Sequence, residues 1–292
     1  MKQYDVIIVG AGPAGSTTAR YISPRRSGIS VLLLDAKRQV GVPIQCGEAL
    51  PTYRDLQWAF PGIDCPELLE LPEQAVASQV RGIRFVLPRG RSYFADVSGL
   101  MFHRDRLDRY LLDQAVAAGA AYRLQARVRN LDEHRVVTDS EEFVGRIIVG
   151  ADGPNSVVSA SFPAFAPNRE LAPCAFVIAE GDFYERHVEM WIDRRFPGGY
   201  FWYFPKNGEA NIGVGVRGSM RVRAILSGML DDLRSRRAFE IKLRSGGVVP
   251  VGGLKRRVAW GHVALVGDAA GMVFPSNGGG TAQAMLGGWM LG

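Results

Sequence analysis

The stretch Gly10-Ala11-Gly12-Pro13-Ala14-Gly15 stands between an apolar run and a series of small residues. The apolar run Tyr4–Val9 precedes the glycines, and the small residues continue to Ile22. This order predicts a buried strand, a tight turn and a helix. A second buried strand is expected at Ser30–Leu34, so the chain opens with a βαβ-type unit.

The spacing of these glycines is typical of a phosphate-binding turn. Gly10 permits the turn, Gly12 lets the backbone approach a pyrophosphate, and Gly15 lets the helix pack on the strand. The free N–H groups and the dipole at the helix start favour an anion. Asp35 follows Gly15 by twenty residues, where its carboxylate would accept hydrogen bonds from ribose hydroxyls. The sequence therefore predicts dinucleotide binding, without separating NAD from FAD.

Two later motifs also put an aspartate after an apolar strand. They are Gly150-Ala151-Asp152-Gly153 and Val266-Gly267-Asp268-Ala269-Ala270-Gly271. In a nucleotide-binding sheet, the carboxyl ends of the strands border the crevice that holds the ligand. Asp152, Gly267 and Asp268 are therefore predicted to contact a ribityl or ribose group.

Between these motifs the pattern predicts a second, sheet-based domain. Residues 41–100 are rich in Pro and Gly, with a short strand at Arg81–Leu87, and are interpreted as a cap-like insertion. A helix is expected from Arg104 to about Ala118, followed by strand-like pieces across 121–149 and, at Val263–Gly267, another short buried strand. We assign 1–160 and 250–292 to a discontinuous dinucleotide-binding domain and 161–249 to a substrate domain.

An aromatic strand is the clearest feature of the predicted substrate domain. Tyr200, Trp202 and Phe204 would share one face, with Phe201 and Tyr203 on the other. Pro205-Lys206-Asn207-Gly208 then turns the chain into a second strand at Ile212–Val216. Because such a face offers apolar area with a few polar tips, one face is predicted to line a site for a long apolar substrate, although aromatic strands also serve as plain core. The residues predicted for substrate binding are Tyr200, Trp202, Phe204 and Pro205.

The composition is that of a globular protein, with 47% hydrophobic and 22% charged residues in a chain of 292 residues. The three cysteines and four histidines show no C-x-x-C and no ligand pair, so we expect no metal site. The formal charge of +6 suits an anionic lipid headgroup or simply a solvated surface, and no nucleic-acid motif is present. With no apolar run of spanning length, we expect a cytoplasmic protein that can bind peripherally to a membrane.

The order G-x-G-x-x-G, then D-G, then G-D resembles the FAD-dependent superfamily of p-hydroxybenzoate hydroxylase-like proteins. Within it, the stretches Pro43–Ala49, Gly199–Pro205 and Gly271–Gly280 resemble geranylgeranyl reductases, and the archaeal digeranylgeranylglycerophospholipid reductase-like branch resembles the chain most. The resemblance implies an α/β fold, with an interrupted Rossmann-like FAD-binding domain and an inserted α+β sheet domain over the isoalloxazine. The chain stops at Gly292, within the helix expected from Thr281, so the family's C-terminal helical part is expected to be absent.

The resemblance also implies a cofactor and a set of residues around it. FAD would be contacted by Ala14, Asp35, Cys46, Gly47, Arg104, Val128, Asp268, Gly280 and Thr281. Gly278, Gly279 and Gly280 open a helix whose N–H groups would face the flavin. Cys46 lies in a loop that the family places near the flavin ring, which makes it a candidate for proton donation or gating, although free cysteines are commonly just small buried hydrophobes.

The function that the resemblance implies is the FAD-dependent reduction of C=C bonds in geranylgeranyl or other prenyl chains, as in lipid biosynthesis. NAD(P)H, a ferredoxin or another redox partner would supply the electrons. Two alternatives remain at this point. One is an FAD-dependent monooxygenase, either an aromatic hydroxylase or a halogenase-like enzyme, although the halogenase signature W-x-W-x-I-P is missing. The other is a truncated, inactive FAD-binding protein.

Overall fold

The structure is a computed structural model that describes residues 2–25, 28–218 and 221–292. It divides into two compact units, each made of separate chain segments. Unit 1 comprises Met1–Val42, Asp105–Glu170 and Pro250–Gly292, and unit 2 comprises Pro43–Arg104 and Leu171–Val249. The chain passes between the units near Val42, Arg104, Glu170 and Pro250.

Unit 1 is built on a mainly parallel sheet with the order β17-β18-β11-β1-β2-β8. β1 pairs in parallel with β2 and β11, and β10 and β9 extend antiparallel from β11. Strands of this kind are buried on both faces, which explains the continuous apolar runs in β1 and β2. The strands are β1 (Lys2–Val9), β2 (Val31–Leu34), β8 (Ala121–Arg123), β9 (Val128–Leu131), β10 (Arg135–Thr138), β11 (Glu142–Gly150), β17 (Ala259–Trp260) and β18 (Val263–Leu265).

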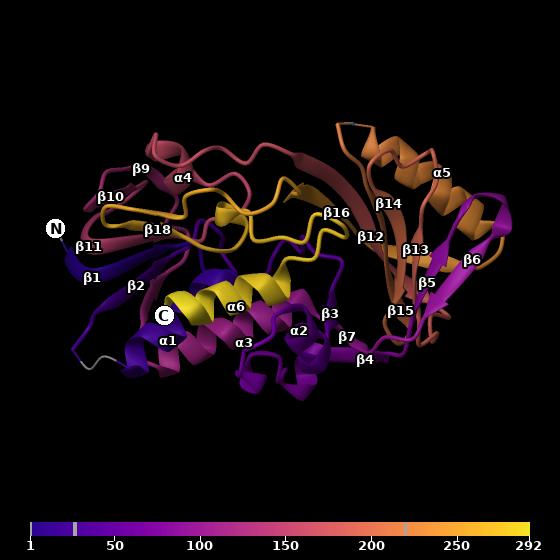
Figure 1. The fold of residues 1–292 in the computed structure, drawn as a ribbon, viewed down its shortest axis with the longest axis horizontal. Coiled ribbons are helices and arrows are strands. Elements are labelled where there is room, and N and C mark those ends of the chain that lie inside the picture. The colour runs from indigo at the N-terminus through magenta and orange to yellow at the C-terminus, as the bar shows by residue number, and fades with distance from the viewer. Residues whose placement is uncertain (1, 26–27, 219–220) are drawn as a thin grey trace. The chain divides into compact units, whose positions relative to one another are not determined.

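Helices from distant parts of the chain pack against this sheet. They are α1 (Pro13–Arg25), α3 (Arg104–Ala117), α4 (Val157–Ser161) and α6 (Thr281–Leu291), with a 3-10 helix at Gly267–Ala270. In Figure 1, α6 lies beside α1, and Gly288 explains the close approach, since a Cβ there would stand 2.6 Å from the carbonyl oxygen of Ala14. This packing joins the glycine-rich turn of the N-terminus to the last segment of the chain.

Unit 2 contains a second sheet with the order β16-β12-β15-β14-β13-β5-β6. Helix α5 (Val222–Arg234) covers one face, where its apolar residues pack with Phe201 and Tyr203 (Figure 1). Trp202 and Phe204 lie on the other face, so the predicted alternation along this strand is confirmed. The strands are β5 (Ile83–Val86), β6 (Ser92–Ala95), β12 (Leu171–Gly181), β13 (Val188–Trp191), β14 (Tyr200–Pro205), β15 (Glu209–Gly215) and β16 (Phe239–Pro250).

The predicted hairpin at the aromatic strand is confirmed as β14 and β15, which pair antiparallel from Tyr200↔Gly215 to Pro205↔Ala210. Asn207 and Gly208 at its turn have φ angles of 59° and 88°. Two successive residues with positive φ form the turn whose twist matches that of the strands, and Asn-Gly is its preferred sequence.

The Pro- and Gly-rich segment differs from its sequence-based interpretation as a cap on the nucleotide fold. Pro43–Arg104 forms one compact unit with Leu171–Val249, because β5 pairs in parallel with β13. The same segment contributes a small sheet with the order β3-β7-β4. Its other elements are β3 (Ala49–Pro51), α2 (Tyr53–Ala59), β4 (Val76–Val80), β7 (Gly99–Phe102) and 3-10 helices at Pro66–Leu68, Glu73–Ala75 and Pro88–Gly90.

Candidate functional site

The geometry of the glycine-rich turn of unit 1 agrees with the structural roles predicted for Gly10 and Gly15. Gly10 has a φ of 106°, and a Cβ on it would overlap the carbonyl oxygen of Ala151. A Cβ on Gly15 would overlap the carbonyl oxygen of Gly10, so the helix packs against the strand end only without a side chain there. A Cβ on Gly12 would meet nothing within 4 Å. No protein atom therefore requires glycine at position 12, and the open space there would allow a ligand to approach the backbone.

Asp35 holds this turn in place at the end of β2. Its Oδ2 accepts a hydrogen bond from the N–H of Ala11 at 2.9 Å, and its Oδ1 accepts one from the N–H of Lys37 at 2.8 Å. Each carboxylate oxygen has a second lone pair. The carboxylate therefore retains the capacity to accept hydrogen bonds from ribose hydroxyls next to the start of α1.

The residues predicted near the other end of the chain lie against the same helix. Gly267 has a φ of 65°, and a Cβ on it would stand 2.8 Å from the Cβ of Ala14. A carboxylate oxygen of Asp268 lies 3.2 Å from the position that a Cβ of Gly280 would take. Gly280 precedes Thr281, the first residue of α6. Two segments of unit 1, Met1–Val42 and Pro250–Gly292, therefore meet at Ala14 and Gly267. They contain the predicted residues Gly10, Gly12, Ala14, Gly15, Asp35, Gly267, Asp268, Gly279, Gly280 and Thr281.

Asp152 and Val128 also belong to unit 1, where both have structural contacts of their own. The Oδ1 of Asp152 accepts from the hydroxyl of Ser156 at 2.5 Å, and its Oδ2 accepts from the N–H groups of Val157 and Val158 at 2.7 and 3.1 Å. Burial raises the pKa of Asp152, and these hydrogen bonds oppose the rise. Asp152 thus anchors the start of α4, and Val128 lies in the core on β9. Their contacts with FAD remain predictions.

In unit 2, Cys46 and Gly47 form a turn before Glu48, a fully buried carboxylate. Glu48 has a φ of 61°, which is uncommon for a residue with a side chain. Its backbone N–H donates to the Sγ of Cys46 at 3.2 Å. Gly47 lies against the sheet, because a Cβ there would stand 3.4 Å from the ring of Phe204.

A buried polar network surrounds this turn, and sequence reasoning missed it. The Oε2 of Glu48 lies 2.7 Å from the Nζ of Lys206, and the two side chains are 0% and 2% exposed. The N–H of Arg104 donates to the Oε1 of Glu48 at 3.0 Å at the start of α3. The amide of Asn211 donates to the Oε2 of Glu48 at 3.2 Å and to the carbonyl oxygen of Cys46 at 2.8 Å. Three parts of unit 2, the Cys46–Glu48 stretch, the start of α3 and the β14–β15 hairpin, thus meet at one carboxylate.

The aromatic residues predicted for substrate binding border this network. The indole N–H of Trp202 donates to the Oδ1 of Asn211 at 2.8 Å. Trp202 and Phe204 are 7% and 9% exposed, and Tyr200 packs with them on the same face of β14. Burial raises the pKa of Tyr200 well above its usual range, so its hydroxyl stays protonated. Pro205 ends the strand immediately before Lys206.

A signal for Asn211 was present in the sequence, since it is the one polar residue in the apolar run from Ala210 to Val214. A polar side chain in such a strand is buried and needs partners. Lys206 gave no such signal, because a lysine beside Asn-Gly normally lies at an exposed turn. Both residues contact Glu48, which is more than 150 positions away in the chain, and no local pattern reveals such a partner.

The described residues, 2–25, 28–218 and 221–292, contain neither a candidate metal-binding cluster nor a helix that could span a membrane. No group of three or more His, Cys, Asp or Glu side chains there has an arrangement that would hold a metal ion. No helix in the same residues is long and apolar enough to cross a membrane.

Comparison with known proteins links both units to described families. Residues 172–248 match the model of the geranylgeranyl reductase catalytic domain, and residues 5–178 match that of the lycopene cyclase protein family. The chain is 35% identical to digeranylgeranylglycerophospholipid reductase 1 of Methanopyrus kandleri, with 99% of this chain and 80% of the relative covered. Reductase 2 of the same organism is 34% identical, with 99% and 76% covered.

Solved structures share the fold at lower sequence identity. A geranylgeranyl bacteriochlorophyll reductase-like protein from Thermoplasma acidophilum superposes with a TM-score of 0.84 at 23% identity, covering 99% of this chain and 77% of that one. Aklavinone-11 hydroxylase, solved with FAD and aklavinone, superposes with a TM-score of 0.73 at 19% identity, covering 99% and 61%. The predicted fold class is therefore confirmed.

Proposed function

The chain belongs to the family of digeranylgeranylglycerophospholipid reductases, and from this membership we propose that it is an FAD-dependent oxidoreductase that reduces C=C bonds of prenyl chains on lipids or lipid precursors. The observation that carries the proposal is the 35% identity to a named reductase over 99% of the chain. The geometry of both units supports it, because unit 1 presents an open phosphate cradle and unit 2 presents an aromatic face beside a cysteine.

The residues of unit 1 fit the chemistry of FAD. The N–H groups at the start of α1 would bind the pyrophosphate, where Gly12 leaves the backbone accessible. Asp35 would accept hydrogen bonds from the adenosine ribose, and Asp268, beside Gly280, is our candidate for the ribityl chain. When bound and reduced, FAD would supply a hydride to one carbon of the alkene.

The residues of unit 2 fit an apolar, chain-like substrate and the proton that its reduction needs. An isolated alkene has no carbonyl to stabilise negative charge, so its second carbon must receive a proton from the protein or from a held water. We propose that Cys46 donates or gates this proton. Trp202 and Phe204 would hold the prenyl chain on their shared face.

The test of this function is anaerobic conversion of a prenyl lipid. The purified chain is reduced with dithionite, and a geranylgeranyl-bearing lipid is added while lipid mass and the flavin spectrum are followed. We expect the lipid to gain two hydrogens per double bond as the flavin reoxidises. Bound flavin without any gain in mass would count against the reductase. Oxygen-dependent turnover of an aromatic compound would instead favour the monooxygenase that the hydroxylase fold likeness suggests.

Replacing Cys46 by serine tests the proposed catalytic residue. A hydroxyl is a much weaker acid than a thiol, so prenyl reduction should slow by about tenfold to a hundredfold if Cys46 supplies the proton. The FAD content should stay unchanged, since the cradle is in unit 1. Full activity of Cys46→Ser would remove Cys46 from the mechanism.

Comparing NADH, NADPH and a reduced ferredoxin as reductants of the bound flavin would identify the electron donor.

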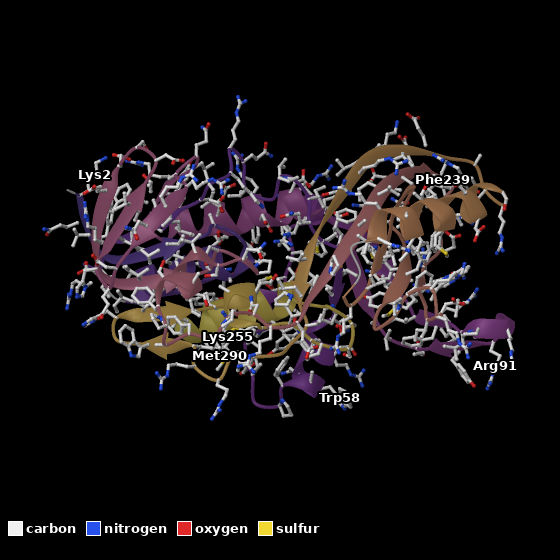
Figure 2. All side chains as sticks on the ribbon, turned by 90° about the horizontal axis from the view of Figure 1, so that it is seen from above. Lys2, Trp58, Arg91, Phe239, Lys255 and Met290 are labelled. Carbon is white, nitrogen blue, oxygen red and sulfur yellow. The ribbon has the colours of Figure 1, made fainter. Side chains whose placement is uncertain are left out.

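We further propose that unit 2 contacts the membrane that holds the lipid substrate. Trp58 on α2 is 87% exposed, and Tyr93 and Phe94 on β6 are 55% and 58% exposed. Figure 2 shows Trp58 and Arg91 pointing away from the ribbon of this unit. Tryptophan and tyrosine favour the membrane interface, and arginine attracts anionic headgroups.

Trp58→Ser should weaken binding of the full chain to phosphatidylglycerol vesicles by roughly fivefold, because an inserted indole is lost. The measurement is co-sedimentation over a range of lipid concentrations. Trp260→Ser is the matched control, since Trp260 is 40% exposed and its ring packs 5.9 Å from that of Phe162. Equal binding of Trp58→Ser and the unchanged chain would disprove this contact.

A further inference from the structure

Asn211 is a fully buried amide that uses both its oxygen and its nitrogen. Its Oδ1 accepts from the indole of Trp202 at 2.8 Å, while its Nδ2 donates to the carbonyl oxygen of Cys46 at 2.8 Å. One side chain thus joins the residue proposed to handle the proton to a residue proposed to hold the prenyl chain. A buried amide with these partners has one orientation that satisfies all of them, so it fixes the geometry on both sides.

Glu48 and Lys206 form a second set of contacts that holds the turn of Cys46 and Gly47. The backbone of Glu48 adopts a left-handed conformation that an L-residue disfavours, and such conformations persist where surrounding contacts hold them. The contacts here are the ion pair with Lys206 and the hydrogen bonds from Arg104 and Asn211. Because these groups are buried, the carboxylate cannot exchange them for water without opening the site.

We propose that Asn211 is a positioning residue that holds the Cys46 turn and the Trp202 indole in one fixed arrangement, with the Glu48–Lys206 pair as its anchor. The inference deepens the proposed function and rests on it for its catalytic consequence. The fixed position of the Cys46 turn, however, is a property that is measurable without any turnover. Asn211 itself need not touch the substrate or FAD.

The reactivity of the three cysteines provides that measurement. Cys46 is half-buried, and Cys65 is buried with its Sγ donating to Glu67 at 3.0 Å. Burial raises the pKa of the Cys174 thiol to about 11, so little of it is thiolate at pH 8. Alkylation of the native chain by iodoacetamide, read by peptide mass, therefore reports separately on Cys46.

Asn211→Leu removes the hydrogen bonds of the Asn211 amide while keeping a side chain of similar size. The rate of Cys46 alkylation should rise about tenfold, as expected when the hydrogen bond from Asn211 to the carbonyl oxygen of Cys46 no longer restrains the turn. The FAD content should stay at the level of the unchanged chain, and kcat/KM for prenyl reduction should fall by about tenfold. If Asn211→Leu does not fold, Asn211→Ser, which is too short to reach Cys46, is measured in the same way.

Tyr203→Phe is the matched control, because Tyr203 follows Trp202 directly on β14. Tyr203 faces the opposite side of the sheet, where its hydroxyl donates to Glu185 at 3.0 Å and its ring belongs to the cluster that contains the apolar residues of α5. In Tyr203→Phe, the rate of Cys46 alkylation should stay within about twofold of the rate in the unchanged chain. Alkylation in Asn211→Leu that also stays within twofold, or an equal rise in Tyr203→Phe, would overturn the proposal. A chain that reduces no prenyl lipid but shows the selective rise would refute the proposed function alone.

Discussion

Gly12→Val should abolish the retention of FAD while leaving the fold of the chain intact. A Cβ at Gly12 would meet no protein atom within 4 Å, so we expect valine to cost the fold little in packing. The same side chain would occupy the space through which a pyrophosphate reaches the N–H groups at the start of α1. Loss of hydrogen bonds to a charged group worth about 3 kcal/mol corresponds to an affinity lowered by about a hundredfold.

The measurement is the ratio of flavin absorbance to protein after purification and dialysis, with FAD titrated into the stripped protein. Gly15→Val is the matched control, because its Cβ would overlap the carbonyl oxygen of Gly10 and should disrupt the fold itself. Hydrogen exchange in β1 should therefore be unchanged in stripped Gly12→Val and faster in Gly15→Val. FAD bound by Gly12→Val with the affinity of the unchanged chain would show that the cradle is not the cofactor site.

The fold of unit 1 could be predicted because its signals are local. The strand expected at Tyr4–Val9 is β1, Lys2–Val9, and the helix expected from Arg104 to about Ala118 is α3, Arg104–Ala117. Each element depends on residues that are near one another in the sequence, and glycines follow the element at its end. The same holds for the β14–β15 hairpin, where Asn207-Gly208 specifies the turn.

The placement of the 41–100 segment could not be predicted in this way. The pairing of β5 with β13 joins Ile83 to Val188, and no periodicity in either strand names its partner. The Pro and Gly content of the segment indicated only where the regular nucleotide fold stops. Its assignment to unit 2 depends on packing between strands about a hundred residues apart, which is a tertiary effect.

The candidate site divides in a similar way. The structural roles of Gly10 and Gly15 follow from their spacing, because each role depends on the backbone of its neighbours, whereas the approach of a pyrophosphate to Gly12 stays a prediction. Asp152 was predicted from the same kind of pattern. Its carboxylate holds the start of α4 in the structure, and its contact with FAD stays a prediction. An aspartate a few residues before a helix can also accept hydrogen bonds from the free N–H groups of the first turn, and the sequence does not distinguish the two uses.

Lys206→Met should destabilise unit 2 by about 3–5 kcal/mol, because it leaves the carboxylate of Glu48 buried without its counter-charge. Methionine keeps the length and the apolar stem of lysine, so the change removes little packing. Lys242→Met is the matched control in the same unit. Lys242 also lies 2.7 Å from a carboxylate, that of Glu180, but both side chains are about half exposed, and the loss should be below about 1 kcal/mol.

The double variant Glu48→Gln, Lys206→Met separates the charge from the shape of the site. Glutamine keeps an oxygen that can accept from the N–H of Arg104, so only the buried charges disappear. Replacement of a complete buried pair is commonly close to neutral, and we expect most of the lost stability to return. Because the two units need not unfold together, hydrogen exchange of the β14 and β15 amides is the appropriate measurement. A double variant as unstable as Lys206→Met would mean that the lysine contributes through packing rather than through its charge. A loss in Lys206→Met no greater than in Lys242→Met would mean that Glu48 does not need the charge of Lys206 to stay in the folded sheet.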